Sequence, residues 1–267
     1  MSITILGKEY DINIEKLDLR FKGFKSLPVE VCNLINLKEL NLCNNSLSSL
    51  STEIGRLINL KELNLCNNSL SSLPEEIGKL IKLQKLYLEC NILSSLPAEI
   101  GKLINLQILN LSYNHFKSLP VEVYNLINLH FLILECNHLI SFPAELCKLI
   151  KLHHLDLRNN QLKSIPVEIS KLIKLHYLDL RNNQLKSVPV EINNLINLQE
   201  LYLNESSYEI NNLDPDCPIL MLGKIQNPIT NLPSGLKTIY LSKDIDVSMI
   251  KIPFGCEINY DFDKILK

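Results

Sequence analysis

The sequence predicts an α/β solenoid, in which short repeats stack along one axis and each repeat contributes one β-strand and one short helix. Two observations lead to this prediction. A 23-residue unit recurs eight times between residues 27 and about 207, and each unit combines two hydrophobic periods. Self-similarity at a fixed period is the signature of folds in which a repeat packs only against its neighbours. The step is kept by one asparagine per unit, at Asn45, Asn68, Asn91, Asn114, Asn137, Asn160 and Asn183.

The helical half of a unit is illustrated by residues 28–37, PVEVCNLINL. Val31, Leu34 and Leu37 are three residues apart, which places them on one side of a short α or 3₁₀ helix. Pro28 suits the first turn of such a helix, and the carboxylate of Glu30 is favourable near its positive end. We therefore expect one short helix per unit, with its apolar side facing inward.

The strand half of a unit has the spacing L-x-x-L-x-L. Leu40 and Leu42 alternate with polar or small neighbours, and this period of 2 predicts a short strand. The chain must turn sharply after each strand, where an asparagine side chain can bond backbone groups that no strand ladder reaches. We therefore expect the recurring asparagines to be buried and hydrogen-bonded to backbone. One unit buries too little apolar surface to stand alone, so the array is expected to be stable only as an array.

The consensus LPxEIGxLxxLxxLxLxxNxLxx resembles the leucine-rich repeat of the intracellular Ras-group kind, which occurs in Ras-pathway scaffolds and their plant relatives. The resemblance covers residues 14–207, about nine units including a half unit at the start. It implies a right-handed solenoid with a parallel β-sheet of at least nine strands on the concave side and short helices on the convex side. It also implies binding of proteins rather than catalysis.

The two ends of the array are expected to shield its core from water. Residues 1–13 are interpreted as an N-terminal cap, with Ile3, Ile5 and Ile12 covering the first leucines. Residues 208–267 are interpreted as irregular β-rich repeats and a C-terminal cap. Within them, the segments 233–241 and 250–260 are predicted to be strands. Their sequence is similar to FNIP repeats of amoebae and of the giant viruses that infect them.

Composition excludes several classes of function. With 27 basic and 29 acidic side chains the net charge is −2, which offers no electrostatic footprint for nucleic acid or an anionic membrane. Neither a signal peptide nor an apolar run long enough to span a bilayer is expected. The eight cysteines are therefore expected to be reduced thiols in a cytoplasmic protein, in the host cytoplasm if the source is viral. A monomer is expected.

No catalytic or cofactor-binding constellation is predicted. The sequence contains neither a Gly-rich phosphate loop nor a nucleophile elbow. His130, His153 and His176 share one slot of the repeat, so their recurrence follows from the repetition and no metal site is expected. Cys43 and Cys66 also occupy equivalent slots, and we interpret them as thiols that fill small polar positions. We expect a protein that is not an enzyme and needs no cofactor.

The side chains between the strand leucines point out from the sheet, and they predict where a partner binds. An apolar and aromatic zone lies in the middle of the array, between polar first strands and later strands with Asp-Arg pairs. Exposed aromatic clusters with charged rims are typical of interaction surfaces, although β-favourable filler would give the same pattern. The candidate residues are Tyr87, Ile108, Tyr113, Phe131, Ile133, His154 and Tyr177, with the charged neighbours Glu89, Glu135, Arg158 and Arg181.

The functional hypothesis is a non-catalytic adaptor or scaffold that binds a protein partner on its concave face. Two alternatives remain open: a substrate-recognition component of a ubiquitin ligase, which the FNIP-like tail suggests, and a structural or decoy repeat protein. A column of isoleucines, one per unit from Ile35 to Ile196, is expected to be half buried between convex turns. It could otherwise form an apolar stripe for a convex partner.

Overall fold

The computed structural model describes residues 2–5, 7–185, 188–203, 219–222, 238–241, 248, 252 and 255–259. The chain divides into two compact units, residues 1–138 and residues 139–267, and each is described by itself.

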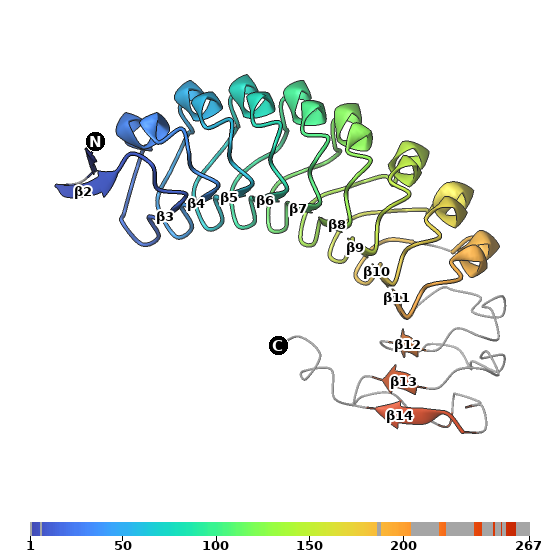
Figure 1. Ribbon diagram of the computed structural model, residues 1–267. Coiled ribbons are helices and arrows are strands. Elements are labelled where there is room, and N and C mark those ends of the chain that lie inside the picture. Colours follow the sequence, from blue (N-terminus) through green and yellow to red (C-terminus); the bar gives the residue numbers. More distant parts are fainter. Residues whose placement is uncertain are drawn as a thin grey trace. The chain divides into compact units, whose positions relative to one another are not determined.

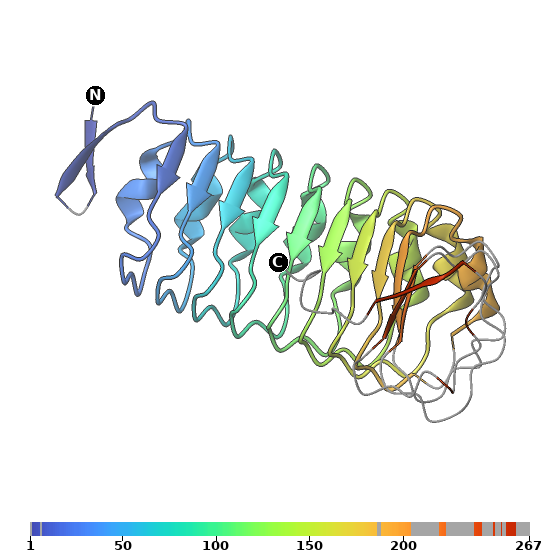
Figure 2. The same ribbon diagram turned by 90° about the horizontal axis from the view of Figure 1, so that it is seen from below.

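The first unit consists of an antiparallel hairpin followed by a parallel sheet. The hairpin pairs β1 with β2, and β3 to β8 pair in sequence order, each strand parallel to the next. Register partners are always 23 residues apart, as Leu40 and Leu63 are, so every repeat adds one strand (Figure 2). The strands are β1 (Ser2–Ile5), β2 (Lys8–Asp11), β3 (Lys16–Asp18), β4 (Glu39–Asn41), β5 (Glu62–Asn64), β6 (Lys85–Tyr87), β7 (Ile108–Asn110) and β8 (Phe131–Ile133).

Short 3₁₀ helices lie on the opposite side of this unit from the strands (Figure 1). Four of the five follow a proline, whose fixed φ suits entry into a helix, and η2 follows Ser51, whose hydroxyl accepts from the Glu53 amide (3.2 Å). The short helices expected from the sequence are thus 3₁₀ helices. They are η1 (Val29–Asn33), η2 (Thr52–Arg56), η3 (Glu75–Lys79), η4 (Ala98–Lys102) and η5 (Val121–Asn125).

The second unit repeats the same design. Its described strands β9 to β14 also pair in parallel and in sequence order. The predicted strands in 233–241 and 250–260 correspond to β13 and β14, and the other residues of those segments lie largely outside the described ones. The elements are η6 (Ala144–Lys148), β9 (His154–Asp156), η7 (Val167–Lys171), β10 (Tyr177–Asp179), η8 (Val190–Asn194), β11 (Glu200–Leu203), β12 (Ile219–Leu222), β13 (Thr238–Leu241) and β14 (Glu257–Asn259).

Leucines form the core between strands and helices. Leu40, Leu42 and their equivalents in the following repeats are 0–1% exposed, as the period of 2 predicts. The isoleucine column is about half exposed, from Ile35 at 50% to Ile150 at 54%, and only Ile196 is much more exposed. Parallel strands on one side and short helices on the other, with a leucine core between them, confirm the predicted solenoid class.

The recurring asparagine forms hydrogen bonds between neighbouring repeats. The Oδ1 atom of Asn114 accepts from the Leu93 amide of the preceding repeat (2.9 Å), and its Nδ2 donates to the carbonyl of Leu88 (2.9 Å) as well as to those of Leu111 and Ser112 (3.1 Å each). The predicted bonding is confirmed. Asn91, Asn114, Asn137 and Asn160 are buried, and Asn45, Asn68 and Asn183 are half-buried.

Among the residues that the structure describes, no helix has the length and apolar character required to cross a bilayer.

Candidate ligand-binding face

The outward side chains of the strands form a surface that we call the strand face. In the first unit much of its charge is neutralised internally. Lys16 pairs with Glu39 (2.7 Å), Lys85 with Glu62 (3.0 Å), and Arg20 with Asp18 (2.7 Å). These pairs are largely exposed, so they contribute little to stability. They also leave the polar early strands with few charges available to a ligand.

The polar residues at the central outward position of the strands accept a hydrogen bond from the backbone. Oδ1 of Asn41 accepts from the backbone amide two residues later, at Cys43 (3.1 Å), and Asn64 and Asn110 do the same (3.0 and 3.1 Å). Asp18, Asp156 and Asp179 make the equivalent bond at 3.0–3.1 Å. These side chains satisfy an amide where the strand ends, a role that sequence reasoning missed although the polar column itself was visible.

Tyr87 and Ile133 interrupt this column in the first unit, because neither can accept that bond from the following amide as a carboxamide or carboxylate does. They lie with Ile108 and Phe131 on β6, β7 and β8, where Ile108 is the register partner of Phe131 and Asn110 is that of Ile133. We call Tyr87, Ile108, Phe131 and Ile133 the apolar patch. Phe131 is 40% exposed and the other three are half-buried, whereas the intervening leucines are fully buried.

Acidic and aromatic side chains lie beside the apolar patch. Glu89 is half-buried, and one of its carboxylate oxygens is buried without a hydrogen-bond partner. Burial raises the pKa of the Glu89 carboxyl. Glu135 is buried and accepts from the Tyr113 hydroxyl (3.0 Å), a bond that raises the pKa of Tyr113. Tyr113 is not on a strand: it occupies the turn after β7, with φ of 53°, and is 50% exposed.

In the second unit the predicted ligand-binding side chains contact one another. The ring of His154 stacks on that of Tyr177 at 4.0 Å, and Tyr177 contacts Tyr202 at 5.0 Å. The guanidinium of Arg181 lies 4.4 Å from the centroid of the Tyr202 ring and pairs with the fully buried Asp179. Arg158 also forms an ion pair with Asp156, with its Nε atom 3.3 Å from Oδ2. The expected Asp-Arg pairing is confirmed.

Burial dominates the electrostatics of this cluster. It lowers the pKa of His154 to about 4, an effect that the positive charge of Arg158 reinforces. It also raises the pKa of the hydroxyls of Tyr177 and Tyr202. At neutral pH the imidazole of His154 is therefore uncharged, and it acts here as a stacking surface rather than as a cation.

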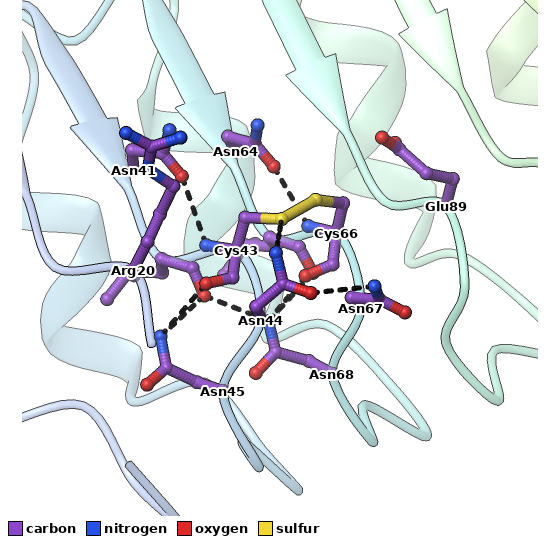
Figure 3. The surroundings of a disulfide bond; sticks show 12 residues. Arg20, Asn41, Cys43, Asn44, Asn45, Asn64, Cys66, Asn67, Asn68 and Glu89 are labelled. Atoms are coloured by element: carbon purple, nitrogen blue, oxygen red, sulfur yellow. Dashed lines mark hydrogen bonds between the residues drawn. A yellow bond between two sulfur atoms is a disulfide. The ribbon is translucent and has the colours of Figure 1, made fainter. Parts of the chain in front are cut away.

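The interpretation of all cysteines as reduced thiols is wrong for two of them. Cys43 and Cys66 form a disulfide across neighbouring strands of the strand face, with their Cα atoms 4.6 Å apart (Figure 3). Parallel strands are about 4.8 Å apart, a spacing within the range that a disulfide bridges. Duplication of a unit with one cysteine therefore brings two cysteines to bonding distance, and their shared slot was the signal. Among the described cysteines, Cys32, Cys90, Cys147 and Cys256 have free thiols.

Within the described part of the chain, no group of three or more His, Cys, Asp or Glu side chains is arranged to hold a metal ion. His153 and His176 stack at 5.2 Å, as their common slot on adjacent strands requires.

Comparisons with known proteins identify the repeat. Residues 35–89 and 81–139 match the family described as leucine rich repeat, and residues 150–190 match leucine rich repeats in two copies. These segments cover more than half of the chain. No curated protein matches the sequence.

Solved structures show the same architecture. A leucine-rich-repeat protein of Leptospira interrogans is 32% identical, with a TM-score of 0.73 over 93% of this chain and 80% of its own. The plant peptide hormone receptor RGFR1, solved with RGF2, is 25% identical (TM-score 0.58) over 86% of this chain. The ectodomain of GASSHO1/SCHENGEN3 from Arabidopsis thaliana, solved with CASPARIAN STRIP INTEGRITY FACTOR 2, is 29% identical (TM-score 0.59) over 93%. This chain spans 48% and 35% of those two plant proteins.

Proposed function

Because this chain belongs to the leucine-rich-repeat family, whose members generally mediate protein–protein interactions, we propose that it is a non-catalytic interaction module that binds a protein or peptide on its strand face. We place the binding site on the apolar patch of Tyr87, Ile108, Phe131 and Ile133. The plant peptide hormone receptor RGFR1 was solved with RGF2, and GASSHO1/SCHENGEN3 was solved with CASPARIAN STRIP INTEGRITY FACTOR 2, which supports a polypeptide ligand.

One observation carries this placement. At the central outward position, the first unit has an asparagine or aspartate on four of its six parallel strands, and at each of these the side chain satisfies a backbone amide. Tyr87 and Ile133 replace that structural role with apolar surface. An apolar substitution that forgoes a structural hydrogen bond is disfavoured unless the surface itself has a use.

The neighbouring side chains fit an anchor role for the patch. Phe131 and Ile108 are register partners on adjacent strands; β7, which carries Ile108, is paired on both sides, and β8, which carries Phe131, is paired with β7. Aromatic and branched side chains on such a rigid support bury much area with little loss of freedom, so they make efficient anchors. Glu89 and Glu135 would orient the ligand more than they strengthen its binding.

A double substitution tests the proposal. A partner is first captured from the source cells with the full chain and identified by mass spectrometry, and is then purified for calorimetry. Phe131→Ala with Ile133→Ala should weaken its binding by at least about 2 kcal/mol, as expected for loss of two buried anchors. The melting temperature should change little, because both side chains point away from the core.

A control uses two residues from the column of the strand face that contains Phe131. Glu39→Ala with Glu62→Ala removes outward side chains from β4 and β5, outside the apolar patch, and should leave the affinity nearly unchanged. An unchanged affinity for the Phe131 and Ile133 variant would contradict the proposal. Equal loss from both double variants would place the ligand elsewhere on the strand face. That His154, Tyr177, Arg158 and Arg181 bind a ligand stays a prediction. Their stacking and ion-pair contacts within the strand face account for their positions without a ligand.

The cytoplasmic location also stays a prediction, and the Cys43–Cys66 disulfide provides its test. Disulfides are rare in a reducing cytosol. N-ethylmaleimide added to source cells before lysis would trap the state of the pair. Labelled thiols at Cys43 and Cys66 would support a cytoplasmic location, whereas an intact bond would support an oxidising compartment.

A further inference from the structure

The Cys43–Cys66 disulfide is held by a frame that does not depend on it. The amides of Leu42 and Asn44 donate to the carbonyls of Asn64 and Cys66 on the neighbouring strand (2.8 and 3.0 Å). Ladder bonds thus lie on both sides of Cys43 and fix the two backbones at their spacing. The two cysteines remain adjacent whether or not their sulfur atoms are joined.

Side-chain amides hold the same frame from both ends, as Figure 3 shows. The amide of Cys43 donates to Oδ1 of Asn41 (3.1 Å), and that of Cys66 donates to Oδ1 of Asn64 (3.0 Å). The Nδ2 group of Asn68 donates to the Cys66 carbonyl (3.0 Å). Opening the disulfide therefore leaves every one of these bonds in place, and the surrounding repeats have no need to move.

The two sulfur atoms are not equivalent. Nδ2 of Asn44 donates a hydrogen bond to Sγ of Cys43 (3.1 Å), and Asn44 is itself held by Nδ2 of Asn67, which donates to its Oδ1 (2.7 Å). No donor to Sγ of Cys66 occurs among the bonds drawn in Figure 3. A donor aimed at one sulfur stabilises negative charge on it, so Cys43 is the better leaving group of the pair.

Charged neighbours lie at both ends of the pair. In the same outward column, Arg20 lies one repeat before Cys43 and Glu89 one repeat after Cys66 (Figure 3). Arg20 is bonded to Asp18, which compensates much of its charge. Burial raises the pKa of the Glu89 carboxyl. Both cysteines keep a small exposed fraction on the strand face, 7% and 9%.

We propose that the Cys43–Cys66 disulfide is a thiol-exchange site, at which a low-molecular-weight thiol of the glutathione type becomes attached to Cys66. The incoming thiolate attacks Sγ of Cys66 and forms a new sulfur–sulfur bond with it. The bond between Cys66 and Cys43 breaks, and its electron pair leaves on Sγ of Cys43 under the Asn44 amide. The exchange is redox-neutral and needs no further oxidant, because one disulfide replaces another.

The test maps the adduct on the folded full chain. The protein is exposed briefly to reduced glutathione under nitrogen at neutral pH, quenched with N-ethylmaleimide, and digested with trypsin for mass spectrometry. Cleavage after Arg56 and Lys61 separates the peptides that contain Cys43 and Cys66. We expect glutathione on Cys66 and N-ethylmaleimide on Cys43 at early times, with an unchanged circular dichroism spectrum.

Asn44→Gly tests whether the Asn44 amide makes Cys43 the leaving group. Glycine tolerates the left-handed φ of 56° at this position and lacks the amide donor. It should slow formation of the Cys66 adduct by about fivefold, the factor expected from one hydrogen bond to the developing thiolate. Asn159→Gly, with φ of 55° in the other unit, is the matched control and should leave the rate unchanged.

Single-cysteine variants provide a second, independent measurement. Cys43 in the Cys66→Ser variant should be alkylated by iodoacetamide at pH 7 faster than Cys66 in the Cys43→Ser variant, since more of it is thiolate. Three results would overturn the proposal: glutathione found mainly on Cys43, no adduct on the folded chain, or an adduct that forms only as the ellipticity is lost.

Discussion

At the residue scale, each recurring asparagine has a hydrogen-bonding task that other side chains cannot perform equally well. Asn114 bonds four backbone groups from two repeats, and an oxygen acceptor and a nitrogen donor are needed at the same place. A second row of asparagines on the outer side is simpler: Nδ2 of Asn105 donates to the Ile81 carbonyl (2.8 Å), and Asn59, Asn128 and Asn197 repeat the contact. The two rows differ in burial, which allows their contributions to be compared.

Replacement of Asn114 by alanine should lower the free energy of unfolding by about 1–3 kcal/mol, because it leaves buried backbone groups of two repeats unpaired. Asn105→Ala is the control: its exposed partner can bond water, so the loss should stay below about 1 kcal/mol. Urea denaturation of both variants measures the difference. Equal stability of the two variants would show that burial of the asparagine does not matter.

His154 makes stability depend on pH in a direction that its environment sets. Its pKa in the folded chain is about 4, below the ordinary value of 6.5. Above pH 6.5 the imidazole is neutral in both states. As pH falls from 6.5 towards 4, the unfolded chain takes up a proton that the folded chain does not, so the free energy of unfolding decreases.

The prediction is that the melting temperature falls across this window and that His154→Gln makes the fall shallower. One unit of pKa difference corresponds to about 1.4 kcal/mol, so the change is measurable by calorimetry at several pH values. The same slope in the variant and the parent chain would mean that other groups cause the fall.

At the element scale, the 3₁₀ helices of adjacent repeats stack closely where glycine occurs. A Cβ atom on Gly78 would lie 2.7 Å from Cβ of Glu99 and 2.8 Å from its carbonyl oxygen, and Gly55 and Gly101 are similarly crowded. The same position is Ser170 in η7, so the close approach is a local adjustment rather than a property of every repeat. The periodicity of the sequence reveals that glycine recurs at this position, but it does not reveal which atoms of the next repeat the glycine contacts.

Gly78→Ala should destabilise the chain by about 1–3 kcal/mol, because η3 and η4 must move apart to admit the methyl group. Ser170→Ala, at the equivalent position of η7, should change stability by less than about 0.5 kcal/mol. Thermal unfolding of the two variants compares them directly. A neutral Gly78→Ala would show that the backbone of Glu99 yields without loss.

At the scale of the whole molecule, stability is additive along the array, because each repeat packs only against its neighbours. In the first unit the hairpin β1–β2 provides the end of the stack: β1 packs against η1, and Ile5 is 2% exposed. The apolar patch proposed as the binding site stands on this additive support, so a substitution at one end of the array should leave distant repeats intact.

Ile5→Ala should therefore act locally. We expect a loss of about 2–5 kcal/mol for the repeats that Ile5 shields, from the deleted methylene groups and the cavity that remains. Hydrogen exchange should speed up in β3 and β4 and change little in β7 and β8. Uniform acceleration in all these strands would show that the unit unfolds as one cooperative body.

Much of this protein was predictable because repetition turns a sequence pattern into geometry. The leucine spacing predicted the strands, and the common slot of Asn114 and its equivalents predicted the bonding between repeats. The apolar patch was also visible, since side chains such as Phe131 and Ile133 must point outward if the leucines point inward. Tyr113 was harder to place, because only the positive φ of its turn separates it from the strand.

By itself, the sequence determined the fold class, the side of the sheet on which each strand residue lies, and the column that it joins. These depend only on periods of 2 and 23, which act locally and repeat. The tertiary structure alone decided which column members contact one another: that Cys43 bonds Cys66, that Asn41 caps a strand end, and that the half-buried His154 stacks on Tyr177. The physical reason is that bonding, capping and burial depend on distances of a few ångströms between neighbouring repeats, and periodicity does not contain such distances.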